Sequence, residues 1–241
     1  MTLALETQGL RKSFGGVLVI DDLSISVEAG EALGIVGPNG AGKTTWFNLI
    51  SGAVRADAGK VIFGGKDITR LRRHERCRAG IGRTFQIPKP FSGMTVFENV
   101  LVGATHGRNL RERASYGHCV QVLEITGLIG KVNTLAGSLT LLDRKRLELA
   151  RALATDPKLL LLDEIAGGLT EAEVEELIAE IRKLRETGVT IVWIEHIVHA
   201  LLAVVDRIAV IQFGRKLCEG EPHEVMNSQE VQACYMGGTP A

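Results

Sequence analysis

Short apolar runs alternate with longer amphipathic segments along most of the chain. Apolar runs and apolar–polar alternation predict strands at residues 3–10, 23–27, 32–36, 59–63, 158–163, 189–195 and 207–212. Apolar residues spaced three and four positions apart predict helices at residues 43–51, 94–104, 110–125, 141–154 and 171–186. Strands that alternate with helices favour an α/β fold with a mainly parallel sheet and right-handed crossovers.

Two parts of the chain depart from this alternation. The first two predicted strands are joined through Gly15 and Gly16, so we expect an antiparallel pair that forms an N-terminal β subdomain. The middle of the chain contains helices without strands, which predicts an inserted helical subdomain at about residues 87–155. The whole chain, residues 1–241, is then a single domain whose core comprises residues 1–86 and 156–241.

A glycine-rich motif separates the strand at residues 32–36 from the helix that follows it. Residues 37–44 read GPNGAGKT and match the P-loop pattern G-x-x-x-x-G-K-[ST] in the strand–loop–helix context that this pattern requires. Glycines let several amide groups face one anion, Lys43 reaches the β- and γ-phosphates, and Thr44 holds Mg²⁺ through its hydroxyl. The residues expected to bind ATP here are Gly37, Asn39, Gly40, Ala41, Gly42, Lys43, Thr44 and Thr45.

An acidic pair follows the apolar strand at residues 158–163. The carboxyl end of a buried parallel strand is where α/β sheets bind ligands. We therefore expect Asp163 to support the Mg²⁺ shell and Glu164 to polarise or deprotonate the water that attacks the γ-phosphate. An acidic pair that only caps a strand is the plainer alternative, and the P-loop in the same chain disfavours it.

Overall composition narrows the class of protein. The chain has 241 residues, 45% hydrophobic and 23% charged, as expected of a globular domain. Its formal net charge is zero, so we expect no nucleic-acid partner. No apolar run is long enough to cross a bilayer and no signal-peptide pattern opens the chain, which predicts a soluble protein that is not secreted. The four cysteines lack metal-ligand spacing and suit reduced thiols in a cytosol.

In their order along the chain, these motifs resemble the ATP-binding subunits of ABC transporters. The resemblance covers essentially the whole sequence and implies the ABC ATPase fold. Gln86 matches the Q-loop glutamine, which touches Mg²⁺ and the attacking water, and His196 matches the switch histidine that contacts the γ-phosphate. Phe14 matches the aromatic residue that stacks on adenine. Each residue alone has a plainer interpretation, as a surface amide, a capping or core histidine, or a core aromatic, and their common order supports the resemblance.

Finer resemblance points to the importers of branched-chain or related amino acids. The matching segments are residues 47–48, 83–86, 94–100, 166–169, 206–208 and 235–237. Membership of that group implies a peripheral ATPase on the cytoplasmic face of the inner (plasma) membrane. It also implies a homodimer, or a heterodimer with a sister ATPase, that closes on ATP. The further partners would be two transmembrane permease subunits and, indirectly, a periplasmic or extracellular solute-binding protein.

The signature segment departs from the family pattern. Residues 139–143 read LTLLD where relatives usually carry LSGGQ or LSYGQ, and Thr140 keeps the hydroxyl that would face the partner's γ-phosphate. In one interpretation, Thr140 and Asp143 form a capping box that leaves the helix N-terminus directed at phosphate. In the other, Leu142 crowds the phosphate and Asp143 repels it. We favour the first because the capping geometry is locally consistent.

These features predict an ATP-hydrolysing importer subunit, with two alternatives. The altered signature also suits a weakly hydrolysing regulatory partner in a heterodimer. A soluble ABC ATPase outside transport is the other alternative, although such proteins usually carry a second cassette, a coiled coil or a zinc motif.

Residues 86–100 are expected to dock a cytoplasmic helix of the membrane subunit. Phe91, Met94 and Phe97 are either part of that contact surface or part of the core. A basic run nearby is expected to be a solvated helix face. Its members are Arg70, Arg72, Arg73, Arg76 and Arg78.

Overall fold

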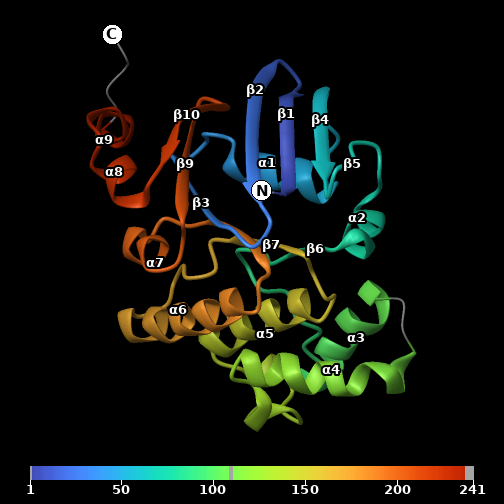
Figure 1. Ribbon diagram of the computed structural model, residues 1–241. Coiled ribbons are helices and arrows are strands. Elements are labelled where there is room, and N and C mark those ends of the chain that lie inside the picture. Colours follow the sequence, from blue (N-terminus) through green and yellow to red (C-terminus); the bar gives the residue numbers. More distant parts are fainter. Residues whose placement is uncertain (1, 109–110, 237–241) are drawn as a thin grey trace.

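A six-stranded sheet forms the centre of the computed structural model, which describes residues 2–108 and 111–236 (Figure 1). Neighbouring strands run parallel except at one edge, where β10 is antiparallel to β9. Across the sheet the strands are β10 (Arg215–Gly220), β9 (Arg207–Gln212), β3 (Ala32–Val36), β8 (Thr190–Ile194), β7 (Leu159–Asp163) and β6 (Ile81–Arg83). The predicted α/β fold with a mainly parallel sheet is confirmed.

A second sheet, which is antiparallel, is built mainly from the N-terminal residues. β1 (Leu3–Phe14) pairs with β2 (Val17–Glu28) as predicted, and the other edge of β1 is extended by β4 (Ala58–Phe63) and β5 (Lys66–Asp67). The first two strands are longer than predicted. Their outer ends carry exposed residues such as Val17 and are held by cross-strand backbone pairing, so they show no alternation of buried and exposed positions.

Helix α1 (Lys43–Ser51) packs between the two sheets. Trp46 and Phe47 of this helix are fully buried in an apolar cluster with Leu5 of β1 and Ile35 of β3. Burial of each such side chain stabilises the fold by about 1.5–3 kcal/mol. The helix that follows the glycine-rich loop is therefore fixed on both sides.

The other long helices cover the opposite face of the parallel sheet (Figure 1). They are α3 (Val96–Arg108), α4 (Glu112–Ile125), α5 (Leu141–Leu153) and α6 (Glu171–Glu186). Successive side chains of a strand point to opposite faces, so in β7 Leu160 packs toward these helices while Leu161 packs toward α1. Residue 110, the predicted start of one of these helices, lies outside the described residues.

Several short elements were not predicted from the sequence. Besides β5, β6 and β10, they are α7 (Val198–Leu202), α8 (Pro222–Asn227), α9 (Gln229–Met236) and the 3-10 turns η1 (Ile129–Lys131) and η2 (Ala136–Ser138). Helix α2 (Arg73–Ala79) coincides with most of the basic run, which was expected to be a helix face. Most of the elements that were not predicted are too short to repeat an apolar period, and β10 reads RKLCEG, with little apolar character. No helix within the described ranges combines the length and apolarity needed to cross a bilayer.

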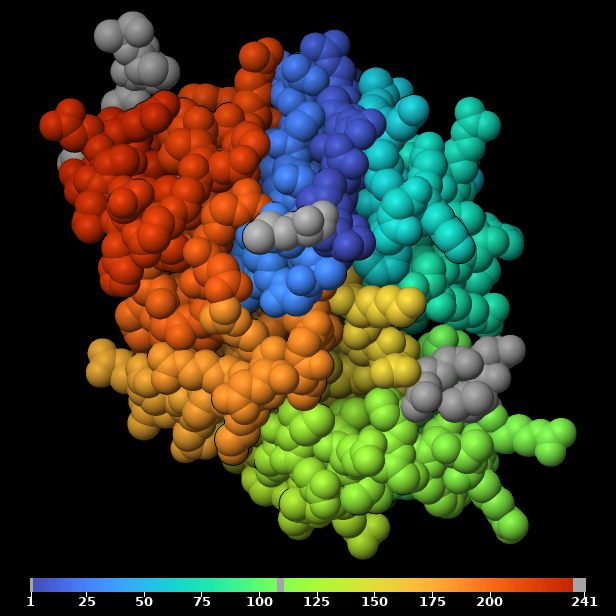
Figure 2. Space-filling view, viewed as in Figure 1, coloured from blue at the N-terminus to red at the C-terminus, as the bar shows by residue number. Residues whose placement is uncertain are grey.

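The hairpin of β9 and β10 lies against β2 of the other sheet. The Asp21 amide donates to the Gly214 carbonyl at 3.0 Å. The Arg215 guanidinium also bonds to the Asp21 carboxylate and lowers its pKa. Figure 2 shows the two segments side by side on the surface, the C-terminal one in red and the N-terminal one in blue. The last third of the chain therefore reaches the N-terminal sheet.

The expectation that the basic run is a solvated face holds for every member except Arg76. Arg76 is only 2% exposed, and its guanidinium donates to the carbonyls of Leu49 and Ile50 at 2.6 and 2.8 Å. It also donates to the Thr69 and Leu71 carbonyls at 2.8 and 3.1 Å. The last carbonyls of a helix have no partner within it, so Arg76 caps the C-terminal end of α1.

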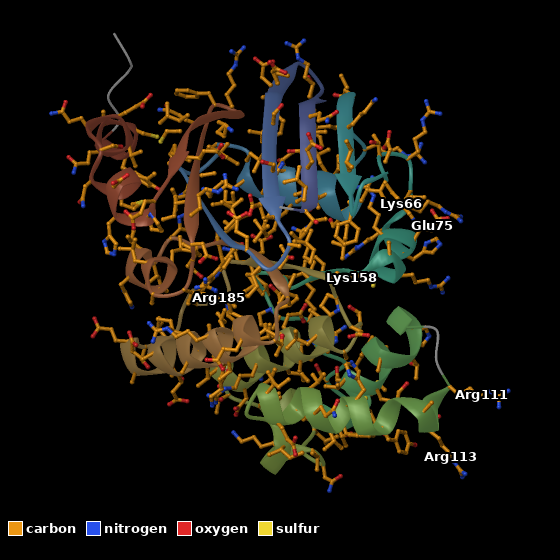
Figure 3. All side chains as sticks on the ribbon, viewed as in Figure 1. Lys66, Glu75, Arg111, Arg113, Lys158 and Arg185 are labelled. Atoms are coloured by element: carbon orange, nitrogen blue, oxygen red, sulfur yellow. The ribbon has the colours of Figure 1, made fainter. Side chains whose placement is uncertain are left out.

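The start of α2, the helix that carries Arg76, is held by the exposed pair Arg72 and Glu75. The Glu75 carboxylate accepts from the Arg72 amide at 2.7 Å and from its guanidinium, which lowers the pKa of Glu75 to about 2. Figure 3 shows Glu75 at the outer side of α2. The first turn of α2 is thus closed on itself, and Arg76 extends from it into the interior.

We predict that Arg76→Met lowers the free energy of unfolding by about 2–4 kcal/mol, because several buried carbonyl groups lose their donor. Chemical denaturation measures this change. Arg70→Met, at an exposed position of the same basic run, is the control and should change the stability by less than about 0.5 kcal/mol. Equal effects of the two substitutions would contradict the capping role.

Candidate active site

The loop of residues 37–42 connects β3 to α1 through a tight backbone curl. Gly37 and Gly42 have φ angles of 147° and 103°. A Cβ on Gly37 would lie 2.0 Å from the Ile211 carbonyl oxygen, and one on Gly42 would lie 2.9 Å from the Val19 carbonyl oxygen. Only glycine fits at either position. No side chain caps the start of α1, so its first amide groups stay available to an anion.

Lys43, the first residue of α1, is buried within this curl. Its ammonium donates to the carbonyls of Gly37 and Pro38 at 2.6 and 3.0 Å. Burial lowers the pKa of Lys43, and the nearby carboxylates of Glu164 and Asp163 oppose that shift. The P-loop lysine and the acidic strand end, which lie far apart in sequence, are therefore close enough to interact.

Three of the residues expected to be catalytic meet at the end of β7. His196 Nε2 lies 2.8 Å from Glu164 Oε1, and the Gln86 side-chain amide donates to the other oxygen of the same carboxylate. The Glu164 backbone is held in a left-handed conformation (φ 48°), with its amide bonded to the Ile194 carbonyl at 2.8 Å. This arrangement points one carboxylate at two polar partners beside the P-loop.

Asp163 has a buried cationic partner. Its carboxylate pairs with the Arg83 guanidinium at 2.9 Å, and both side chains are less than a tenth exposed. Burial raises the pKa of Asp163, while Arg83 opposes the shift. Arg83 also donates to Asn48 on α1 at 2.7 Å, so this pair ties the strand end to the P-loop helix.

The residues expected to hold Mg²⁺ offer the oxygen donors that this ion prefers. Thr44 supplies a hydroxyl, Gln86 an amide oxygen and Asp163 a carboxylate. Thr44 directly follows Lys43, whose ammonium interacts with Asp163. No cluster of three or more His, Cys, Asp or Glu side chains suited to a metal occurs within residues 2–108 and 111–236. The donor set therefore fits an ion held mainly by phosphate and water, as Mg²⁺ commonly is.

Phe14 lies at the tip of the β1–β2 hairpin. Its side chain is about half exposed, and the Lys12 ammonium lies 5.4 Å from the ring centroid. Further along β2, Ile20 packs within van der Waals reach of Gly42. The ring is thus carried by the hairpin that borders the P-loop, with one face open to a planar ligand.

Thr140 is the N-cap residue of α5. This helix lies in the layer of helices, apart from α1 (Figure 1). The Thr140 hydroxyl accepts from the Asp143 amide at 3.3 Å, which confirms the predicted N-cap. The second bond of a capping box is absent within this described helix start. The short Asp143 side chain binds the Thr140 hydroxyl at 2.9 Å and the Lys131 ammonium instead.

The interpretation in which Leu142 and Asp143 face the phosphate is wrong. Both side chains are buried within their own chain. Burial alone would raise the pKa of Asp143, but Lys131 and the Thr140 hydroxyl lower it below its ordinary value. The exposed apolar side chain of the signature is Leu141, at 44% exposure. Asp143 is therefore a paired anion that does not oppose a phosphate group.

Thr170, which precedes α6, also acts as a helix cap. Its hydroxyl accepts from the Glu173 amide at 3.4 Å, and the Glu173 carboxylate accepts from the Thr170 amide at 2.8 Å. This is a complete capping box at the start of α6. Ile165, the residue after Glu164, is buried.

Lys145 is a site residue that sequence reasoning missed. Its ammonium is buried and donates to the carbonyls of Gln86 and Glu164 at 3.0 and 3.3 Å. Burial lowers its pKa, while Glu195 and Glu164 oppose that shift. Lys145 lies on the buried face of α5, one turn after Leu142, and a buried lysine requires polar partners. This position is the feature of the sequence that could have identified it as a site residue.

Comparison with known proteins agrees with this geometry. A family model described as ABC transporter matches residues 20–167. A probable branched-chain amino acid transport ATP-binding protein, LivG, of Archaeoglobus fulgidus is 37% identical, with 97% of this chain and 95% of that protein covered. The high-affinity branched-chain amino acid transport ATP-binding protein BraF of Pseudomonas aeruginosa is 36% identical over 97% of both chains.

Other relatives differ in the transport system that their names state, or have a solved structure. The lipopolysaccharide export system ATP-binding protein LptB of Haemophilus influenzae is 34% identical over 97% of both chains. The ADP conformation of MJ1267, an ATP-binding cassette of an ABC transporter, superimposes with a TM-score of 0.90 at 32% identity and covers 98% of this chain and 100% of that one. The resemblance drawn from the motifs is thus confirmed, and the chain belongs to the ABC transporter family as an ATP-hydrolysing subunit.

Proposed function

We propose that this chain powers an importer for branched-chain or related amino acids by hydrolysing ATP at the P-loop site. The observation that carries the proposal is the Glu164 carboxylate, bonded to His196 and Gln86 beside the buried Lys43. Full-length similarity to LivG and BraF, whose names state branched-chain amino acid transport, supports the solute class.

The P-loop and its flanking residues bind the nucleotide in this proposal. The amides of the P-loop and of the first turn of α1 receive the phosphate oxygens, and Lys43 exchanges its carbonyl partners for the β- and γ-phosphates. Phe14 stacks on the adenine. When Mg²⁺ is bound, it neutralises charge on the phosphates, and Thr44, Gln86 and Asp163 are the residues that hold it.

Glu164 is the proposed base for hydrolysis. It accepts a proton from the water that attacks the γ-phosphorus, while His196 and Gln86 keep its carboxylate and the water aligned. In this proposal His196, whose Nε2 lies 2.8 Å from Glu164, also supplies a hydrogen-bond donor to the negative charge that develops on the γ-phosphate.

The site is completed by a second copy or a sister ATPase. Thr140 caps the start of α5, and the exposed Leu141 follows it. We propose that this surface meets the γ-phosphate of the partner chain, so that ATP closes the dimer and hydrolysis opens it. Residues 87–155 would move as the helical part, and residues 1–86 and 156–241 as the nucleotide-binding part.

A cleft of about 620 Å³ between α2, α3 and α5 is the proposed docking site for a permease. Its cationic lining residues include Arg73, Arg78 and Arg151. A cytoplasmic segment of the membrane subunit with acidic side chains complements this charge. Docking there would keep the chain peripheral, on the cytoplasmic face of the inner membrane.

The surface expected at residues 86–100 borders this cleft. Arg151 donates to the Lys89 carbonyl at 2.8 Å and lies over the Phe91 ring. Phe91 is exposed and available for contact, whereas Phe97 packs edge-on against Tyr116 at 5.4 Å between ring centroids. The apolar residues are therefore divided between contact surface and interior packing.

Glu164→Gln should keep ATP affinity and lower the hydrolysis rate at least about a hundredfold, because the amide cannot accept the proton of the attacking water. Lys43→Ala should instead abolish tight ATP binding. Equilibrium binding and phosphate release measure the two effects. Unchanged nucleotide affinity in Lys43→Ala would remove the phosphate site from the proposal.

Lys145→Met should reduce the hydrolysis rate at least about tenfold and the free energy of unfolding by about 2 kcal/mol, because two buried carbonyls that position Gln86 and Glu164 lose their donor. Lys183→Met, on the exposed face of α6, is the control. A hydrolysis rate equal to that of the control would contradict a shared anchor for these two residues.

Uptake measurements test the solute class. Deletion of this chain from its source cell should abolish high-affinity uptake of labelled leucine, isoleucine or valine, and Glu164→Gln should fail to restore it.

Similarity to LptB favours a second candidate function, the export of lipopolysaccharide. Normal amino-acid uptake together with lost lipopolysaccharide export would exclude the importer and favour that candidate.

A further inference from the structure

The last described helix, α9, touches the P-loop. The phenol oxygen of Tyr235 accepts a hydrogen bond from the Gly37 amide at 2.9 Å, although the two residues are 198 positions apart in sequence. Val231 and Cys234 on the same helix are buried and hold it against the body of the protein. Figure 1 shows α9 beyond β9 and β10, at the same end of the sheet as the hairpin tips.

Gly37 is held through both of its polar backbone groups. Its amide donates to Tyr235, and its carbonyl accepts from the Lys43 ammonium at 2.6 Å. On a third side, its α-carbon packs so close to the Ile211 carbonyl that no side chain could be added. The peptide where the strand ends and the loop begins is thus fixed, and Tyr235 supplies one of the contacts that fix it.

A second observation places α9 near the lysine itself. The Cys234 side chain lies near the Lys43 ammonium. Tyr235 is also 47% exposed, so its ring is not needed to fill the core and its hydroxyl contact is its main structural role. The helix therefore approaches the P-loop at two successive side chains.

We infer that Tyr235 is a positioning residue for the phosphate site, which holds Gly37 so that the P-loop keeps the curl required for the ATP phosphates. A phenol oxygen accepts an amide hydrogen bond, which phenylalanine cannot do. Tyr235 lies outside the group formed by Glu164, His196 and Gln86. It therefore acts on nucleotide affinity and leaves the chemical step to those residues.

Tyr235→Phe in the full chain tests this inference. Loss of one backbone hydrogen bond should raise the KM for ATP about fivefold, with kcat within about twofold and Tm unchanged. The control is Tyr116→Phe on α4, which removes a hydroxyl bonded to Glu112 at 2.9 Å and leaves the P-loop untouched. An unchanged KM in Tyr235→Phe, or equal falls in Tm and affinity in both variants, would overturn the inference.

A spectroscopic readout separates positioning from general stability. The chain has two tyrosines, so 3-fluorotyrosine labelling gives two fluorine resonances, which Tyr116→Phe assigns. Addition of Mg-ATP should shift the Tyr235 resonance and leave that of Tyr116 in place. A Tyr235 resonance that does not respond to saturating Mg-ATP would overturn the inference.

The inference rests on the proposed phosphate site, and one variant distinguishes the two. If Lys43→Ala keeps the wild-type affinity for ATP, the phosphate site is wrong and the role of Tyr235 fails with it. If Lys43→Ala loses affinity and Tyr235→Phe keeps it, only the role of Tyr235 is wrong.

Discussion

The structure depends on buried charges that meet at the carboxyl edge of the parallel sheet. Lys43 ends up beside Asp163 and Glu164, and Arg83 neutralises Asp163. An isolated charge in this position would be costly, because burial removes its hydration. The adjacency of β3, β8 and β7 in one sheet brings the opposite charges together, so the strand order and the site chemistry support one another.

Accurate placement of the site carries a conformational cost. Glu164 is held in a left-handed conformation that costs roughly 1–3 kcal/mol for a residue with a side chain. The strain is sustained because its amide bonds to Ile194 and its carbonyl to Lys145. The strained residue is thereby tied to its neighbours through both of its backbone groups, and the carboxylate keeps one direction.

Local patterns explain what could be predicted from the sequence. The P-loop and the acidic strand end are continuous segments whose chemistry follows from neighbouring residues, and the family resemblance added Gln86 and His196. The contacts of Arg76, Lys145 and Tyr235 were not predictable, because each joins a side chain to backbone groups elsewhere in the chain. The choice between the two interpretations of the signature also needed the structure, because local spacing does not reveal which face of a helix start is covered.

Helix α2 contacts two regions of the molecule. Arg73 and Arg78 belong to the wall of the cleft, and Arg76 between them grips the last carbonyls of α1. Since α1 begins at Lys43, the guanidinium of Arg76 is a direct link between the cleft wall and the phosphate-binding helix, one that does not pass through the sheet.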